Sequence, residues 1–147
     1  MVIFEQTLRA ILIATNLVEK RVFLMRAPQA PASQQQIPYF VFFPVGKSSF
    51  PTHAGPLDQT ETVYQVSIFD TSQSRALAIA DSLRAKLDTL HGSHNGWRIG
   101  HCLFEIQSWQ WEEDVEIFHV IQEYRVMYSA LETQPAAQSA TPIERTA

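Results

Sequence analysis

Residues 61–92, with the sequence ETVYQVSIFDTSQSRALAIADSLRAKLDTLHG, change their hydrophobic period at Asp70. Before this residue, Tyr64, Val66 and Ile68 occupy alternate positions, and a period of two predicts a β-strand with one better-buried face. After it, apolar residues recur every three or four positions, which predicts an amphipathic α-helix of about five turns. These helix residues are Ala76, Ala80, Leu83, Leu87 and Leu90. The strand and the helix are therefore expected to bury their apolar sides against each other.

Both ends of the predicted helix carry capping signals. The polar run Asp70-Thr71-Ser72-Gln73 is expected to supply helix-capping side chains, and Gln73 follows Asp70 by three residues, which resembles the spacing of a capping box. His91 and Gly92 follow the last apolar turn, and glycine often occupies the position just past a helix. Since no catalytic motif lies on this strand and helix, the unit indicates a fold class and not a function.

The size and composition of the chain are typical of one globular domain. It has 147 residues, of which 46% are hydrophobic and 18% are charged, enough to bury a core without disulfide staples. Eleven Lys and Arg residues stand against fifteen Asp and Glu residues, which gives a net charge of −4. A chain of this charge is not expected to bind DNA irrespective of sequence, because such binding needs Lys and Arg to displace counterions.

The sequence also indicates where the protein is made. Cys102 is the single cysteine, which excludes an internal disulfide framework and fits a reducing compartment. The first residues lack the basic flank of a secretory signal, and no apolar run approaches the roughly 20 residues that span a bilayer. We therefore expect a soluble protein made in a cytoplasm.

The other periodic segments complete an α+β pattern. Besides the unit at 61–92, the spacing predicts a helix over residues 3–15, a short strand over 20–25, and longer strands over 38–44, 97–111 and 117–131. We expect a single domain, residues 1–131, with a mixed or antiparallel sheet of about four strands packed against two α-helices. Residues 27–36 are predicted to form a solvated loop, and residues 132–147 a disordered polar tail.

Two of these strands have informative patterns. In residues 38–44 both sets of alternate positions are apolar, which suits a strand covered on both faces. In residues 117–131 the aromatic and β-branched residues share one face, and Gln122 interrupts them. That face is expected to pack against the core.

Residues 45–59 are expected to form a mobile hairpin or a binding loop, because the segment is longer than most connections. It is rich in Gly, Pro and Ser, yet it carries apolar residues that a spacer does not need. Gly46-Lys47-Ser48 resembles the end of a phosphate-binding loop, but Val41 stands where that pattern needs a glycine, and no helix is expected to follow. The segment is interpreted as an interface element that orders on binding. Its candidate residues are Lys47, Ser48, Ser49, Phe50, His53 and Leu57.

A histidine-rich turn is the first candidate for chemistry. His91, His94, His101 and Cys102 lie within twelve residues, but only His91 and His94 have a spacing typical of paired zinc ligands. His101 and Cys102 are adjacent strand positions, so their side chains are expected to point to opposite faces. Surface and core histidines are the simpler interpretation.

An acidic run is the second candidate. Glu112, Glu113, Asp114 and Glu116 offer paired carboxylates for acid–base catalysis, which requires one of them to be desolvated. The run is predicted to form a turn, so we interpret it as a solvated hairpin tip. Trp109 and Trp111, just before it, share a strand face and suit either an interface or the core.

Six short segments, in one order between Leu8 and Met127, resemble the small tail-completion proteins of long-tailed bacteriophages, also called tail-terminator or tail-to-head joining proteins. After a leading helix, the segments are 21–23 (RVF), 27–29 (APQ), 37–41 (IPYFV), 55–57 (GPL), 63–69 (VYQVSIF) and 76–84 (ALAIADSLR). Each is common by itself, so the resemblance depends on their order and spacing.

This resemblance implies a structural subunit without catalytic residues, cofactors or metal ligands. It implies a homohexameric ring on the end of the tail tube, at the head-proximal end of the virion tail. The opposite side of the ring would meet head-completion or connector proteins, and DNA would pass through the lumen without specific binding. Residues 45–59 would then dock on a neighbouring subunit or on the tail-tube protein. The residues leave open one alternative, a small α+β ligand-binding or metal-dependent hydrolytic protein that uses the histidine-rich turn.

Overall fold

The computed structural model describes residues 3–26, 37–52 and 55–131. Its elements, in chain order, are α1 (Phe4–Ala14), β1 (Val22–Leu24), β2 (Tyr39–Thr52), β3 (Gly55–Asp70), α2 (Gln73–Leu87), β4 (Gly92–His94), β5 (Trp97–Glu112) and β6 (Ile117–Ala130). The strands form one mixed sheet in the order β1-β2-β3-β6-β5-β4. The loop predicted at residues 27–36 and the disordered tail predicted from residue 132 lie outside the described residues.

The α+β class and the mixed sheet are confirmed, but the described chain has six strands where about four were expected. The long strands β2, β3, β5 and β6 correspond to the four expected ones. The two others, β1 and β4, have three residues each and lie at the two ends of the strand order. β1 lies within the short strand expected over residues 20–25. β4 was not predicted, because three residues are too few to show a hydrophobic period.

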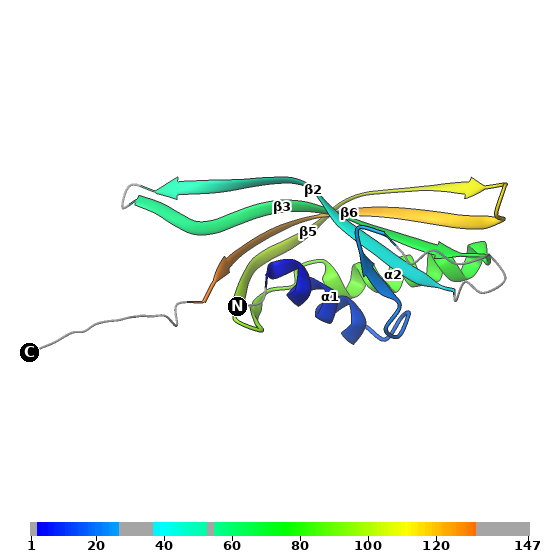
Figure 1. Ribbon diagram of the computed structural model, residues 1–147, viewed down its shortest axis with the longest axis horizontal. Helices are drawn as coiled ribbons and strands as arrows, with labels where there is room; N and C mark the ends of the chain where they lie inside the picture. Colours follow the sequence, from blue (N-terminus) through cyan, green and yellow to red (C-terminus); the bar gives the residue numbers. More distant parts are fainter. Residues whose placement is uncertain (1–2, 27–36, 53–54, 132–147) are drawn as a thin grey trace, which may run out of the picture.

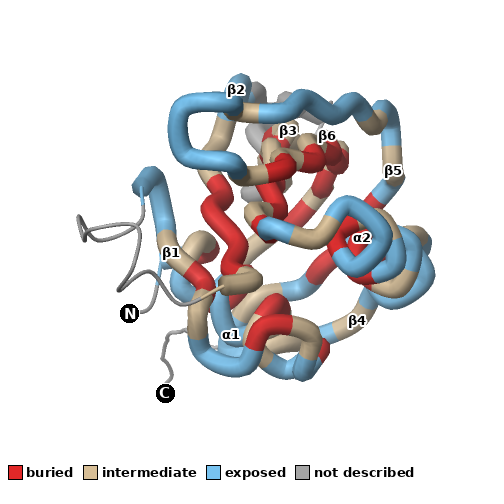
Figure 2. The backbone as a smooth tube through the Cα atoms, turned by 90° about the vertical axis from the view of Figure 1, so that its right-hand side faces the viewer, coloured by how far each residue is buried: buried red, intermediate tan, exposed pale blue. Residues whose placement is uncertain are grey.

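Both helices cover the same face of the sheet, and the core lies between them and the strands (Figures 1 and 2). Alternate residues of β6 point into this core, which confirms the predicted face. The buried residues of β6 are Phe118, Val120, Gln122, Tyr124, Val126 and Tyr128. Gln122 is accommodated because its amide donates to the carbonyl of Ala80 at 3.0 Å and to Gln107 at 2.8 Å, and accepts the Tyr124 hydroxyl at 2.7 Å.

The other face of the sheet carries a row of stacked rings. Tyr39 on β2 stacks on Phe69 of β3 with ring centroids 4.9 Å apart, and Phe69 stacks on His119 of β6 at 4.2 Å. Phe23 on β1 meets the edge of Tyr39 at 6.1 Å. This row helps to keep Tyr39 buried on a face that neither helix covers. Residues 39–42 are thus buried on both faces of the strand, but rings of the sheet itself, and not a second layer, cover this face.

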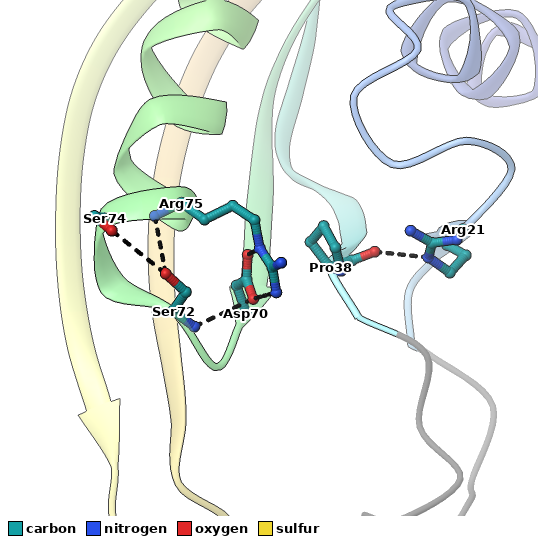
Figure 3. A network of polar contacts seen from close by, with 6 residues as sticks. All are labelled: Arg21, Pro38, Asp70, Ser72, Ser74 and Arg75. Atoms are coloured by element: carbon teal, nitrogen blue, oxygen red, sulfur yellow. Dashed lines mark hydrogen bonds and ion pairs between the residues drawn. The ribbon is translucent and has the colours of Figure 1, made fainter.

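Helix α2 begins after an ion pair between the buried Asp70 and the half-exposed Arg75 (Figure 3). The run expected to supply the cap does so, because the N-cap is Ser72, whose Oγ accepts the Arg75 N–H at 3.3 Å. The resemblance of Asp70 and Gln73 to a capping box is wrong, because Asp70 is not the N-cap residue. Asp70 ends β3 and is fully buried. Its carboxylate accepts the Ser72 N–H at 3.2 Å and two guanidinium N–H groups of Arg75 at 2.6 Å each. A bidentate pair of this kind is strong and directional, so Asp70 holds the turn between β3 and α2.

Helix α2 ends at Leu87, about one turn before the predicted stop at Gly92. Asp88 has extended backbone angles and Thr89 has a φ of 68°, so the helix cannot continue through them. The Asp88 carboxylate instead accepts the backbone N–H of Phe104 at 3.1 Å. This bond to β5 is a tertiary contact, which the helical stripe of the sequence does not reveal.

Residues 45–52 and 55–59 form paired strands, so the hairpin interpretation is confirmed and the loop interpretation is wrong. β2 continues to Thr52 and β3 begins at Gly55. Prolines are tolerated here because β2 is an edge strand beyond Phe42, where its pairing with β1 ends. The register of β2 against β3 also shifts after Pro44 and before Pro51, and such bulges absorb residues that disturb a ladder.

The helices themselves are short. Within the described residues, neither has the length and apolar character needed to cross a membrane. α1 buries Phe4, Thr7, Leu8 and Leu12 against the sheet. Ile3, expected on that buried face, is 54% exposed because it is the N-cap residue and precedes the first turn.

We expect Asp70→Ala to lower the free energy of unfolding by about 1–2 kcal/mol, because the Ser72 N–H loses its buried acceptor. The Arg75 side chain is 51% exposed, so water replaces part of what it loses. Urea unfolding followed by circular dichroism measures the change. The matched control is Ser74→Ala at an exposed position of the same turn, for which a change within about 0.5 kcal/mol is expected. Equal stability of Asp70→Ala and wild type contradicts the assignment.

Candidate functional site

Residues 45–52 of β2 and 55–60 of β3 form a hairpin that extends beyond the helix layer at one end of the sheet (Figure 1). We call this hairpin the β2–β3 arm. Five of the six candidate interface residues lie on it, with Lys47, Ser48, Ser49 and Phe50 on β2 and Leu57 on β3. The sixth, His53, lies outside the described residues. The structure thus brings these five residues onto one hairpin, and their role in an interface stays a prediction.

The base of the arm is joined to helix α1 through Lys47. Lys47 pairs with the buried Thr62, so both residues are on the helix side of the sheet. Its Nζ lies 3.9 Å from a carboxylate oxygen of Glu5, at the start of α1. Lys47 is 55% exposed, whereas Glu5 is 12% exposed, so the pair forms at the edge of the core.

Glu5 is held in place by a buried tyrosine. The Tyr64 hydroxyl donates to Glu5 Oε2 at 2.5 Å. Burial, and then this hydrogen bond to a carboxylate, raise the pKa of Tyr64 far above its ordinary value. Tyr64 is therefore a permanent donor at neutral pH, and Glu5 is fixed between a phenol and an ammonium group.

A pocket of about 450 Å³ opens beside this ion pair, between α1 and the arm. Three aromatic rings form its wall, because Phe4 stacks on Tyr128 at 3.7 Å and Trp97 meets the edges of both, at 5.7 and 5.6 Å. The residues that line it are Ile3, Phe4, Glu5, Lys47, Thr60, Trp97 and Tyr128. This lining suits an apolar or aromatic side chain of a partner with a charged group at the mouth.

The pocket was not predicted from the sequence. Trp97 opens β5 and Tyr128 lies near the end of β6, so the antiparallel pairing of these strands brings the two residues together. The signal that sequence reasoning can use is an aromatic residue at the start of one strand and the end of the next. Phe4 and Glu5 join them only through the packing of α1, which no local pattern indicates.

The histidine-rich turn is not assembled into a centre. His91 is exposed, with Nδ1 3.0 Å from the Thr89 carbonyl oxygen. His101 lies on the other face of β5 from Cys102, as predicted, and its Nε2 is 3.7 Å from a Glu61 carboxylate oxygen. In the described part of the chain, no group of three or more His, Cys, Asp or Glu residues is placed to hold a metal ion.

The pKa values of two other titratable groups, Cys102 and His119, are shifted by burial. Burial raises the pKa of the Cys102 thiol to about 12, and the negative charge of Asp88 adds to that effect. Burial lowers the pKa of His119, partly offset by Glu112, whose carboxylate lies 3.9 Å away. The thiol is thus a poor nucleophile, and His119 serves as a neutral ring stacked on Phe69.

The acidic run forms the tip of the β5–β6 hairpin, as predicted. Glu113, Asp114 and Glu116 are exposed in the turn between the two strands. Trp109 and Trp111, on the strand that leads to this tip, are 59% and 49% exposed. The core interpretation of these two tryptophans is therefore wrong.

A charged network lies on the sheet face opposite the helices. Arg125 on β6 donates to both carboxylate oxygens of Glu105 at 2.7 and 3.2 Å, and to Glu61 at 3.0 Å. The pairing of the strands puts Glu61, Glu112 and Glu123 on this face, with Arg98 and Arg125. Glu105 joins them through its bonds to Arg125. The uncovered face is therefore acidic overall.

Comparison with solved structures shows what kind of fold this is. The chain is similar to a chain of the virion of a native gene transfer agent particle, with 16% identity and a TM-score of 0.63, over 86% of this chain and 91% of that chain. A second solved structure is 17% identical over 87% of this chain and 96% of its own, with a TM-score of 0.47, too low to carry an argument. No protein-family model and no curated protein matches the chain. The first likeness shows a shared fold along nearly the whole chain.

We expect the Cys102 thiol to be almost unreactive in the native protein. With a pKa of about 12, about 10⁻⁴ of the thiol is ionised at pH 8, and reactivity rises about tenfold per pH unit as the thiolate forms. The measurement is alkylation by iodoacetamide between pH 7 and 9, with the same protein in 8 M urea (about the usual unfolding concentration) as the control. Native alkylation as fast as in urea contradicts the burial of this residue.

Proposed function

We propose that this chain is a structural protein of a phage-like virion, which caps the end of the tail tube and joins the tail to the head. The observation that carries the proposal is the shared fold, over 86% of the chain, with a chain of a gene transfer agent virion. The order of six sequence segments between Leu8 and Met127 supports the same assignment to the tail-completion proteins. The proposed form is a homohexameric ring.

The chemistry of the described residues suits a structural role. The pocket beside the arm is lined by a carboxylate and an ammonium group that face each other, together with aromatic rings. Such a lining offers contact area and charge complementarity to a partner. The protein partners we propose are a second copy of this chain, the tail-tube protein, and a head-completion or connector protein.

The acidic face of the sheet suits a conduit for DNA. If the uncovered face lines the lumen of the ring, Glu61, Glu105, Glu112 and Glu123 outnumber Arg98 and Arg125 there. Like charges repel phosphate, so DNA would pass without being gripped. The net charge of −4 per chain acts in the same direction.

The β2–β3 arm is proposed to dock on a neighbouring subunit or on the tube end. It overhangs the helix layer (Figure 1), and a hairpin that projects from its own core is available to another molecule. Its base is fixed by the contact between Lys47 and Glu5. A fixed base reduces the entropy lost when the arm is ordered in a contact.

We expect shortening of the arm to separate folding from assembly. Replacement of residues 50–59 by Asn-Gly joins Ser49 to Thr60, which already pair, through a two-residue turn suited to a hairpin. The melting temperature is expected to change by less than about 4 °C, because the arm projects from the core. Binding to tail tubes, measured by co-sedimentation, is expected to be lost.

The matched control for this variant replaces only His53-Ala54 by Asn-Gly, which keeps the arm at full length. This control is expected to bind tubes as wild type does. Normal tube binding by the shortened chain would overturn the docking role of the arm. A large loss of melting temperature would instead show that the arm belongs to the folding unit.

We expect the protein on purified tails to form a ring of about 100 kDa, six times the 16.7 kDa of one chain, through closed cyclic symmetry. Native mass spectrometry of rings released from tails, and of the free protein, measures this mass. Tube ends favour the assembled form by mass action, so the ring is expected first on tails. A stable dimer in both settings contradicts the proposal.

A further inference from the structure

The outer half of β5 has a free edge. β4 pairs only with residues 97–99 of β5, and the Asp88 carboxylate takes up the backbone N–H of Phe104. Beyond Phe104, no strand in the described ranges pairs with this side of β5. An unpaired edge presents backbone donors and acceptors to any other chain that can lie along it.

Large apolar side chains gather along this free edge. Ile106 is 56% exposed, Trp109 is 59% exposed and Trp111 is 49% exposed. With Leu103 and Val115, these residues make up five of the nine large apolar side chains that are exposed in the described part of the chain. Ile106 pairs with Glu123 on the face opposite the helices, whereas Trp109 and Trp111 pair with core-facing residues of β6 and lie on the helix side. Exposed apolar groups therefore line this edge on both faces of the sheet. Such groups mark an interaction surface, and tryptophan in particular is enriched where binding energy is concentrated.

The tip of the same hairpin is acidic and unpaired. Glu113, Asp114 and Glu116 are exposed, and none of them forms an ion pair with another described residue. We call this apolar and charged surface the acidic edge. It consists of Ile106, Trp109, Trp111, Glu113, Asp114, Val115 and Glu116.

The opposite end of the sheet has the complementary character. Around β1, Leu24 and Met25 are exposed apolar residues, at 36% and 62%. Lys20 and Arg26 flank them, both exposed and without an ion pair to a described residue, and residues 20–26 contain no acid. We call Lys20, Leu24, Met25 and Arg26 the basic edge.

The acidic edge and the basic edge cannot contact each other within one molecule. β1 and the β5 side are the two ends of the strand order, and Figure 2 shows them on opposite sides of the molecule. A two-fold contact of the acidic edge with itself would bring acids against acids, which is unfavourable. The arrangement that pairs unlike charges, and covers apolar groups on both sides, is head-to-tail.

We propose that the acidic edge of one copy of this chain binds the basic edge of the next copy. The contact rests on the ring assembly proposed above and names the two surfaces that make it. It is heterologous, so each subunit uses one edge for each neighbour, and repetition by a fixed rotation closes a ring. The tryptophans supply apolar contact area, and the charges at the tip set the direction.

Charge exchange between the two edges tests this contact. The first variant is Glu113→Lys with Asp114→Lys, which makes the acidic edge basic. The second is Lys20→Glu with Arg26→Glu, which makes the basic edge acidic. Each alone is expected to weaken self-association at least about tenfold, because every contact then joins like charges. An equimolar mixture of the two variants is expected to assemble again. If the variants alternate around an even-numbered ring, every contact joins an edge made basic or left basic to an edge made acidic or left acidic.

Sedimentation velocity up to about 1 mM protein, where contacts of only a few kcal/mol are populated, measures the association of each sample. Circular dichroism checks that every variant is folded. The matched control is Asp81→Lys, which reverses an exposed acid on α2 and is expected to associate as wild type does. Trp109→Ser keeps all charges and is expected to weaken association as well, which separates the apolar contribution from the charges.

The outcomes distinguish this contact from the proposed function. Wild-type-like association of both charge variants, or failure of their mixture to assemble, overturns the contact, and hexamers on purified tails would still support the ring. If the wild-type chain stays monomeric throughout the concentration range, the contact is also overturned, because it does not hold two copies together without other proteins. Recovery in the mixture, but not in either variant alone, supports it.

Discussion

The pairing of β3 with β6 is the constraint on which the rest of the structure depends. Twelve consecutive residues of β3, from Gln59 to Asp70, pair with residues 118–129 of β6 without a shift of register. This ladder joins segments far apart in the chain and places one continuous apolar face beneath both helices. A slip of one residue would turn every side chain of one strand to the opposite face, so burial of the β6 aromatic residues holds the register in place.

Both hairpins extend from this central pair, and each reaches past the helices in its own direction (Figure 1). The helices cover the middle of the sheet, so the parts of β2, β3, β5 and β6 that are buried lie there, while the ends of the strands remain available. The middle of the sheet and the ends of its strands therefore have different roles. The centre holds the fold through contacts such as those of Gln122 with α2, β5 and β6, and the ends carry the surfaces proposed to bind partners.

The charged groups also differ between the interior and the ends of the sheet. In the interior, the carboxylates are held by named partners, as Asp70 is by Arg75 and Glu5 is by Tyr64. Outside, the acids of the hairpin tip and the bases near β1 lie at opposite ends of the sheet and do not pair with each other. Separation of unlike charges within a subunit favours directional contact between subunits over non-specific clustering.

The sequence by itself determined the elements whose pattern is local. The alternation of β6, the buried stripe of α2 and the class of the fold follow from side-chain period, and the exposed acidic tip follows from a polar turn between two strands. Only the tertiary structure decided where α2 ends, because Asp88 bonds to β5. It also decided that residues 45–52 and 55–59 are strands and that Phe4, Trp97 and Tyr128 line a pocket. These features depend on contacts between segments distant in sequence, and a local pattern carries no information about them.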